Sequence, residues 1–97
     1  MARGGWVYIL ASRYQGTIYI GVTASLAERI NQHRSGERSE FAAMYQCRRL
    51  VHVEPFDAIE DTIQREKRLK KRNRQWKIRQ IEEANPDWLD LYDELLQ

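Results

Sequence analysis

The chain has 97 residues, of which 42% are hydrophobic and 31% are charged. This length fits one domain, expected over residues 1–97, and leaves no room for two. No apolar run reaches the length of a transmembrane helix, and the first ten residues lack the pattern of a signal peptide. Cys47 is the single cysteine, so no internal disulfide can form, and we expect a small buried side chain in a cytoplasmic protein.

The net charge of +2 conceals a strong asymmetry along the chain. Residues 64–77 contain eight basic residues and one acidic residue, a net charge of +7, whereas residues 82–97 contain six acidic residues and no basic one, a net charge of −6. A basic segment of this density indicates a polyanionic partner such as nucleic acid. A solvated helix face is the alternative interpretation of the same residues.

Hydrophobic periodicity and turn residues predict three strands and four helices in the order ββαβααα. The strands are expected at residues 6–10, 17–22 and 48–56, with a turn at 12–16 between the first two. The helices are expected from 26 to about 36, from 57 to about 73, over 74–84 and from 86 onward, and residues 37–46 are expected to be irregular or weakly helical. This order predicts an α+β fold in which a small three-stranded antiparallel sheet is flanked by helices.

Capping residues define the expected helix boundaries. Ser25 with Glu28 three residues later forms a capping-box pattern, and Asp57 with Glu60 repeats it. Gly36 is expected to close the first helix. The last helix is expected to begin at the cap and proline of residues 85–86, with an apolar stripe of Trp88, Leu91, Tyr92 and Leu95.

Two tyrosines lie in the predicted hairpin. A four-residue loop would pair Ala11 with Gly16, and the same register pairs Tyr8 with Tyr19. Opposed residues point to the same side of a hairpin, so two phenol hydroxyls are predicted to lie close together. A plain aromatic pair packed against a helix is the alternative.

Three charged or titratable side chains lie at or beside apolar helix stripes. Arg29 and His33 are four residues apart, so they share a face at the border of the first helix's stripe, where an arginine can also be an ordinary surface residue. The stripe of the second helix is expected to contain Ile59, Ile63 and Leu69. Glu66 lies within that stripe, which requires a paired carboxylate, a metal ligand or a position at the edge of a cleft. An ion pair with Lys70 is the simplest alternative.

These features, in this order, resemble the GIY-YIG nuclease superfamily. The first element of that pattern reads here as residues 6–8, the second as residues 19–21, and the match continues through Arg29, His33 and Glu66. More narrowly, the chain resembles the small stand-alone bacterial branch of excinuclease-like GIY-YIG domain proteins. The resemblance covers nearly the whole chain and implies the same three-stranded fold.

The resemblance implies a metal-dependent endonuclease that hydrolyses phosphodiester bonds in DNA, structure-selective at most, in a DNA-repair setting. By this resemblance Glu66 would hold one Mg²⁺ or Mn²⁺ ion, and Arg29 would bind the scissile phosphate. His33 would relay a proton or contact the phosphate. Tyr8 would position or deprotonate the attacking water with Tyr19 beside it, and both phenols stay open as the general base.

The basic helix is expected to follow the nucleic-acid backbone without reading bases. The residues proposed for this contact are Arg65, Lys67, Lys70, Lys71 and Arg74. Trp76 interrupts the basic run and is expected to pack in the core rather than stack on a base. His52 lies in the third strand and is expected to be structural or exposed.

The chain departs from the family pattern at two places. Trp6 and Val7 replace a glycine and an isoleucine of the first element, and Ala43 and Met44 stand before Tyr45 where relatives often carry lysine and arginine. The loss of two positive charges supports an alternative function, a non-catalytic or weakly active nucleic-acid-binding module of the same fold. A protein-interaction domain that uses the acidic tail is a third hypothesis, which an exposed apolar stripe in the last helix would favour.

Overall fold

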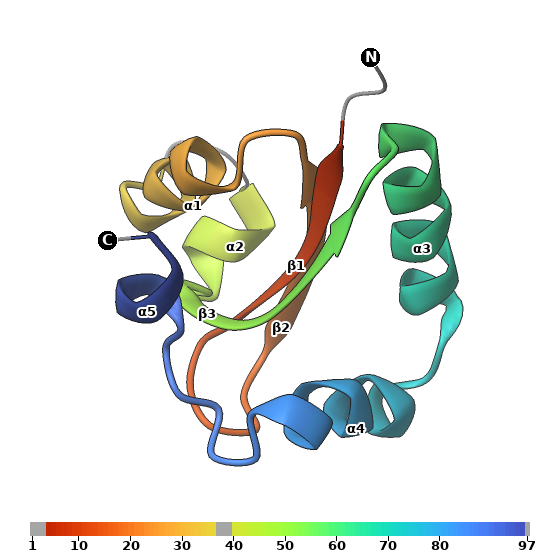
Figure 1. Cartoon of the computed structure of the whole chain (residues 1–97). Helices are drawn as coiled ribbons and strands as arrows, with labels where there is room; N and C mark the ends of the chain where they lie inside the picture. The colour runs from red at the N-terminus through yellow and green to blue at the C-terminus, as the bar shows by residue number, and fades with distance from the viewer. Residues whose placement is uncertain (1–3, 37–39, 97) are drawn as a thin grey trace.

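The computed structural model describes residues 4–36 and 40–96 (Figure 1). Its elements are β1 (Gly5–Ala11), β2 (Ile18–Thr23), α1 (Leu26–Arg34), α2 (Glu40–Met44), β3 (Arg49–Phe56), α3 (Ile59–Lys71), α4 (Arg74–Ala84) and α5 (Tyr92–Leu96). The strands form one antiparallel sheet in the order β2-β1-β3, which confirms the predicted fold class. A short helix, α2, occupies part of the stretch predicted to be irregular or weakly helical; residues 37–39 of that stretch lie outside the described residues.

The sheet is covered on both faces. Figure 1 shows α1, α2 and α5 on one side of the strands and α3 on the other, with α4 at the lower end of the sheet. Side chains of β1 alternate between these sides, because successive residues of a strand point to opposite faces. We call the side that receives Tyr8 and Leu10 the α1 face, and the side that receives Val7 and Ile9 the α3 face. Both sets are fully buried, which explains the almost unbroken apolar run of β1.

The register of the hairpin differs from the prediction by two residues. Ala11 pairs with Ile18, so Tyr8 lies opposite Gly21, and Tyr19 lies opposite Leu10. The loop is longer than expected because the backbone N–H of Ser12 donates to the carbonyl of Thr17 and the Ser12 hydroxyl accepts from the Thr17 N–H. A shift of two residues leaves every side chain on its predicted face, so both phenols still lie on the α1 face.

Two predicted helix caps are wrong in detail. Helix α1 begins after Ser25 as expected, but the Ser25 side chain makes no capping hydrogen bond. The backbone N–H of Ser25 donates to the hydroxyl of Thr23. Helix α3 begins after Ala58 rather than after Asp57, again without a side-chain cap. Gly36 closes α1 as predicted, with a positive φ of 81° that glycine adopts without strain.

The break between α3 and α4 lies close to its predicted place. Helix α3 ends at Lys71, and the Asn73 side chain caps α4 by accepting a hydrogen bond from the backbone N–H of Trp76. Trp76 packs against the core of the α3 face, as predicted. The buried stripe of α3 contains Thr62 and Leu69, whereas Ile63, expected in it, is 39% exposed.

The predicted last helix from residue 86 is wrong. Residues 86–91 form an irregular segment, and α5 begins only at Tyr92. The reason is Asn85, whose buried side chain donates to the carbonyls of Val51 and Leu89 and accepts from the Leu89 N–H, so that it closes a loop instead of capping a helix. Trp88 is fully buried on the α3 face, which weakens the hypothesis of an exposed interaction stripe.

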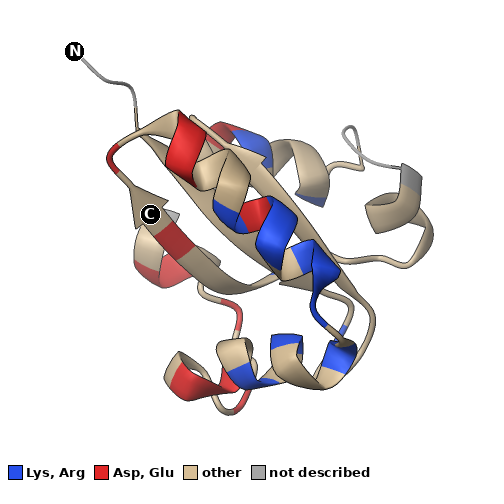
Figure 2. Cartoon of the chain, turned by 90° about the vertical axis from the view of Figure 1, so that its right-hand side faces the viewer, with Lys and Arg blue, Asp and Glu red and all other residues tan. Residues whose placement is uncertain are grey.

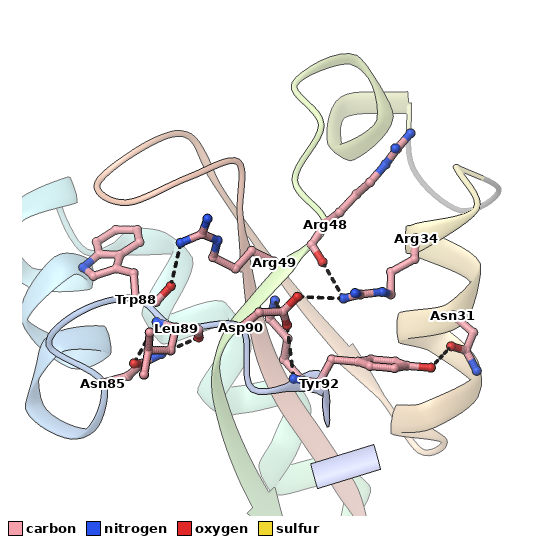
Figure 3. Close-up of polar contacts among 10 residues, drawn as sticks. Asn31, Arg34, Arg48, Arg49, Asn85, Trp88, Leu89, Asp90 and Tyr92 are labelled. Atoms are coloured by element: carbon pink, nitrogen blue, oxygen red, sulfur yellow. Dashed lines mark hydrogen bonds and ion pairs between the residues drawn. The ribbon is translucent and has the colours of Figure 1, made fainter. Parts of the chain in front are cut away.

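The segment that follows Asn85 ties β3 to α1 (Figure 3). Asp90 accepts a hydrogen bond from the backbone N–H of Leu50 in β3 and forms an ion pair with Arg34 of α1. The Tyr92 hydroxyl donates to the side chain of Asn31, also in α1, and the Arg34 guanidinium lies 4.2 Å from the centre of the Tyr92 ring. These bonds fix the outer side of α1.

Charge is separated on the surface as the sequence predicted. Figure 2 shows lysine and arginine gathered along the second half of α3 and on α4, and acidic residues near the start of α3 and after α4. Within the described part of the chain, no helix combines the length and the apolar character needed to cross a membrane.

Candidate active site

Tyr8 is buried in the α1 face and lies across the motif glycine of β2. A Cβ atom on Gly21 would overlap the hydroxyl and ring carbons of Tyr8, so only glycine leaves room for the phenol at this position. The Tyr8 hydroxyl lies 2.9 Å from Nε2 of His33, and His33 is only 3% exposed. The structure thus gives a packing reason for the tyrosine of the first motif element and the glycine of the second.

Tyr19 completes an aromatic cluster with this pair. Its ring centre lies 5.1 Å from that of His33 and 6.4 Å from that of Tyr8. Unlike Tyr8, which is fully buried, Tyr19 is only partly buried. The predicted proximity of the two phenols is present, and Tyr19 is the one that reaches solvent.

Arg29 of α1 lies beside the far end of β2. Its Nη1 atom donates to the carbonyl of Val22 at 3.2 Å, and the side chain is partly buried. Arg29 also lines a polar hollow of about 290 Å³ at the start of α1. The remaining lining residues are Thr23, Ala24, Ser25, Glu28 and Gln32. The guanidinium therefore borders an open, polar space next to the edge strand of the sheet.

Glu66 lies on α3, which covers the opposite face of the sheet. Its side chain is 14% exposed, and Oε2 forms an ion pair with Nζ of Lys70 at 3.3 Å. The structure describes no direct bond between Glu66 and Arg29. Lys70, the ion-pair partner of Glu66, lines a hollow together with Tyr19.

That hollow, which we call the β2-edge hollow, has a volume of about 180 Å³. Its lining residues are Ile18, Tyr19, Ile20, Phe41, Lys70 and Lys77. Tyr19 and Phe41 come from the α1 face, whereas Lys70 and Lys77 come from the helices of the α3 face. Of the candidate catalytic residues, only Tyr19 lines this hollow, and Arg29 lines the separate hollow at the start of α1.

The donor set for a metal ion is sparse. Among the described residues, no group of three or more His, Cys, Asp or Glu side chains is placed to hold a metal ion. Glu66 alone offers a partly buried carboxylate next to this edge. A single carboxylate suits an ion such as Mg²⁺, which keeps several water ligands and takes others from phosphate oxygens. The residues present fit such an ion and do not fit one that needs a cage of protein ligands.

The predicted nucleic-acid-binding residues fall into two groups. Three lysines on α3 have exposed side chains: Lys67, Lys70 and Lys71. Lys70 also forms an ion pair with Glu66. Arg74 is exposed but donates to the carbonyls of Gln15 and Gly16 in the hairpin loop.

Arg65 is committed to a bond network inside the fold. Its guanidinium donates to both carboxylate oxygens of Glu54, at 2.8 and 3.1 Å, and to the side chain of Gln80 at 2.9 Å. A phosphate contact by Arg65 stays a prediction. The hydrogen bonds that Arg65 makes to Glu54 and Gln80 favour a structural role.

Glu54 is the most perturbed acid of this network. His52 lies 2.7 Å from the same carboxylate, which gives His52 a structural partner. Burial of Glu54 raises its pKa, but hydrogen bonds from His52 and Arg65 outweigh that effect and lower the pKa to about 2. Burial raises the pKa of the Cys47 thiol, which is fully buried as predicted.

Sequence reasoning did not select two aromatic residues near Tyr19. The Phe41 ring centre lies 6.4 Å from that of Tyr19 and 4.8 Å from that of Tyr45. Phe41 and Tyr45 are 46% and 48% exposed. Their spacing of four residues was a usable signal, because it places both rings on one side of a helical turn.

The comparisons with known proteins agree with this fold. Residues 4–79 match the family model described as the GIY-YIG catalytic domain. The chain is 32% identical over 81 residues to a UPF0213 protein of Natronomonas pharaonis, covering 84% of this chain and 94% of the relative. It is 34% identical over 86 residues to a UPF0213 protein of Syntrophus aciditrophicus, covering 84% of this chain and 93% of the relative. No solved structure matches the chain.

The chain belongs to the GIY-YIG family, a nuclease superfamily. Within it, the chain groups with the small proteins that UPF0213 represents, since it spans nearly the whole length of both relatives. Neither relative's name states an activity. GIY-YIG nucleases act on nucleic acid and generally use divalent metal ions.

Proposed function

We propose that this protein is a metal-dependent endonuclease that hydrolyses phosphodiester bonds in DNA. The observation that carries the proposal is the cluster of Tyr8, Tyr19 and His33 over Gly21, in a chain that matches the catalytic domain of a nuclease family. A buried phenol–imidazole contact beside a partly buried phenol, with Arg29 on the same helix as His33, offers groups that phosphoryl chemistry requires. The lone, buried Cys47 is consistent with a reducing cytoplasmic location.

The exposure of the two phenols divides their proposed roles. Tyr19 reaches solvent, so it is the phenol that orients or deprotonates the attacking water. Tyr8 is buried against His33, so its proposed role is to hold the imidazole in place beside Tyr19. The water oxygen gives up a proton and forms the new bond to phosphorus, the ester P–O bond breaks, and the departing oxygen takes up a proton. His33 is the residue proposed to relay this proton.

Arg29 binds the scissile phosphate in this proposal. Its guanidinium lies at the polar hollow beside β2, and its planar fork matches two phosphate oxygens. Glu66 would hold one Mg²⁺ or Mn²⁺ ion, which when bound neutralises negative charge that develops on the phosphate. In the absence of substrate, the Glu66 carboxylate forms an ion pair with Lys70.

The exposed lysines of α3 supply sequence-independent contacts to the DNA backbone. Lys67, Lys70 and Lys71 lie on the helix that carries Glu66, so a strand bound along them passes the proposed metal ligand. Each phosphate contact releases counterions, so binding should weaken as salt rises.

The test is cleavage of labelled DNA of several shapes with Mg²⁺ or Mn²⁺, for the wild type beside Glu66→Ala and Arg29→Ala. Removing one group that stabilises transition-state charge typically costs roughly 10²- to 10³-fold in rate. We expect losses of at least this size for both variants. Glu60→Gln is the matched control, because Glu60 is an exposed acid on the same helix. This variant should cleave DNA like the wild type.

Cleavage that survives both Glu66→Ala and Arg29→Ala comes from a contaminant and contradicts the proposal. Activity of the wild type that is unchanged by a chelator contradicts the metal dependence.

A non-catalytic or weakly active nucleic-acid-binding module is the second candidate function. Ala43 and Met44 favour it, because they leave the region before β3 without two positive charges, and Met44 is 74% exposed where a cation could contact phosphate. Salt-sensitive DNA binding without cleavage under any ion would support this candidate over the first.

A further inference from the structure

We propose that the three rings of Tyr19, Phe41 and Tyr45 form a stacking shelf for unpaired bases of a DNA strand. The proposal rests on the nucleic-acid function above and narrows its substrate to DNA with single-stranded character. The shelf comprises these three residues and borders the β2-edge hollow, which Phe41 and Tyr19 also line.

The rings are arranged as a row. Tyr19 and Phe41 are inclined by 31° with centres 6.4 Å apart, and Phe41 and Tyr45 are inclined by 46° with centres 4.8 Å apart. Phe41 and Tyr45 leave nearly half of their surface exposed, although aromatic side chains of this size contribute most to stability when they are buried. Exposed aromatic faces in a row are the feature on which successive bases stack in proteins that bind single strands.

The positive charge near the three rings favours a nucleic acid over an apolar partner. Lys70 and Lys77 line the same hollow as Phe41 and Tyr19, so two ammonium groups lie where the phosphates of a stacked nucleotide would pass. In a duplex the base faces are covered by their neighbours, so only an unpaired or displaced base offers a face to the rings. The combination of exposed rings and lysines therefore fits a single strand better than a duplex.

The row also joins the candidate active site. Tyr19 contacts His33 on one side and Phe41 on the other, so a base held on Phe41 lies next to the phenol proposed to orient water. A strand held on the shelf would pass along the β2 edge, where Lys70 pairs with Glu66. The shelf would thereby choose which phosphate is cut without reading the identity of a base.

The experiment measures binding in the presence of a chelator, so that no cleavage occurs. The probes are one fluorescent single-stranded DNA, a duplex of the same sequence, and an abasic strand with the same number of phosphates. Stacking of one base is worth about 1–3 kcal/mol, which is roughly a 5- to 150-fold change in affinity. We expect the wild type to bind the single strand about tenfold or more tightly than the abasic strand, and more tightly than the duplex.

Variants separate stacking from charge. Phe41→Ala and Tyr45→Ala should bring the ratio of single-strand to abasic affinity close to one, and Phe41→Trp should preserve it. Met44→Ala is the matched control on the same helix, since Met44 is exposed but lies outside the ring row. Thermal unfolding of each variant checks that the fold is retained.

Equal affinity of the wild type for the normal and abasic strands would overturn the shelf, as would tighter binding of the duplex. Protein that self-associates through Phe41, with no preference for unpaired DNA, would also overturn it. Tighter binding of an RNA strand of the same sequence would overturn the assignment to DNA. Base-dependent binding in a protein that never cleaves leaves the shelf intact while the nuclease proposal fails.

Discussion

The two faces of the sheet share the central strand β1 but bury side chains of different kinds. On the α3 face, β1 contributes Val7 and Ile9 to an aliphatic cluster that Trp88 closes. On the α1 face, β1 contributes Tyr8, whose hydroxyl meets the imidazole of His33 inside the protein. Burying polar groups costs free energy that hydrogen bonds only partly recover, so the α1 face is built for more than packing.

This difference predicts how substitutions should behave on each side. Truncation on the α3 face should lower the free energy of unfolding while folded molecules keep their activity. Substitution of polar groups on the α1 face should reduce activity with a smaller change in stability. The α3 face still carries Glu66 and the lysines on its outer surface, so the distinction applies to buried residues.

The largest effect on stability is expected from Trp88→Ala. Trp88 is fully buried in the α3-face cluster, and its indole N–H donates to Glu82 at 2.8 Å. Loss of a buried tryptophan leaves a large cavity and typically costs about 3–5 kcal/mol. Urea unfolding measures this, with Leu89→Ala as control because Leu89 is 62% exposed. Equal costs for the two variants would contradict the packing described for this segment.

A smaller loss should follow acidification, through Glu54. Its pKa is about 2 in the folded protein against an ordinary value of 4.5, so its ionised form stabilises the fold. The contribution is complete above pH 4.5 and disappears as pH falls towards 2. Its upper size is about 3 kcal/mol, from about 1.4 kcal/mol per pKa unit.

Comparison with Glu54→Gln isolates this acid from the other carboxylates. The difference in unfolding free energy between wild type and variant should be largest at neutral pH and shrink between pH 4.5 and 2. Arg65 and His52 both bind the Glu54 carboxylate. If the difference in unfolding free energy between wild type and variant did not depend on pH, these bonds would not form in solution.

The sequence was sufficient where the signal depended on periodicity. The strands, the fold class and the shared face of Tyr8 and Tyr19 were all predicted, and the common face survived an error of two residues in register because the strand period is two. The register itself was missed because a bond between Ser12 and Thr17 closes the loop. Hairpin loops that differ by two residues leave the same side chains on each face, so the hydrophobic pattern does not distinguish them.

The sequence was insufficient where long-range contacts compete with local signals. The sequence predicted that Asn85 caps a helix. In the structure its side-chain amide instead donates a hydrogen bond to the carbonyl of Val51, 34 residues earlier. The sequence also contained no sign that Glu54 and Gln80 bind the guanidinium of Arg65 in the fold. Motif spacing predicted the individual candidate residues, whereas the placement of Tyr8 and His33 on one face of the sheet and of Glu66 on a helix of the other required the structure.

The smallest expected change in stability, and the sharpest test of the α1 face, is Gly21→Ala. The added methyl group would overlap the Tyr8 phenol, and overpacking of this kind typically costs about 1–3 kcal/mol. The Tyr8 ring must move, so its contact with His33 should break, and the His33 NMR resonances and any DNA cleavage should change together. Leu89→Ala is the control, because Leu89 is 62% exposed in the segment after α4, and its truncation should leave the His33 signals unchanged.

A double-mutant cycle shows whether the cost of Gly21→Ala comes from Tyr8. In a Tyr8→Leu background the shorter side chain leaves room for the methyl group, so Gly21→Ala should cost less than in the wild type. If the two costs simply add, Tyr8 does not lie over Gly21. The glycine of the second motif element would then need a reason other than the phenol of the first, and the geometric basis of the proposed active site would fail with it.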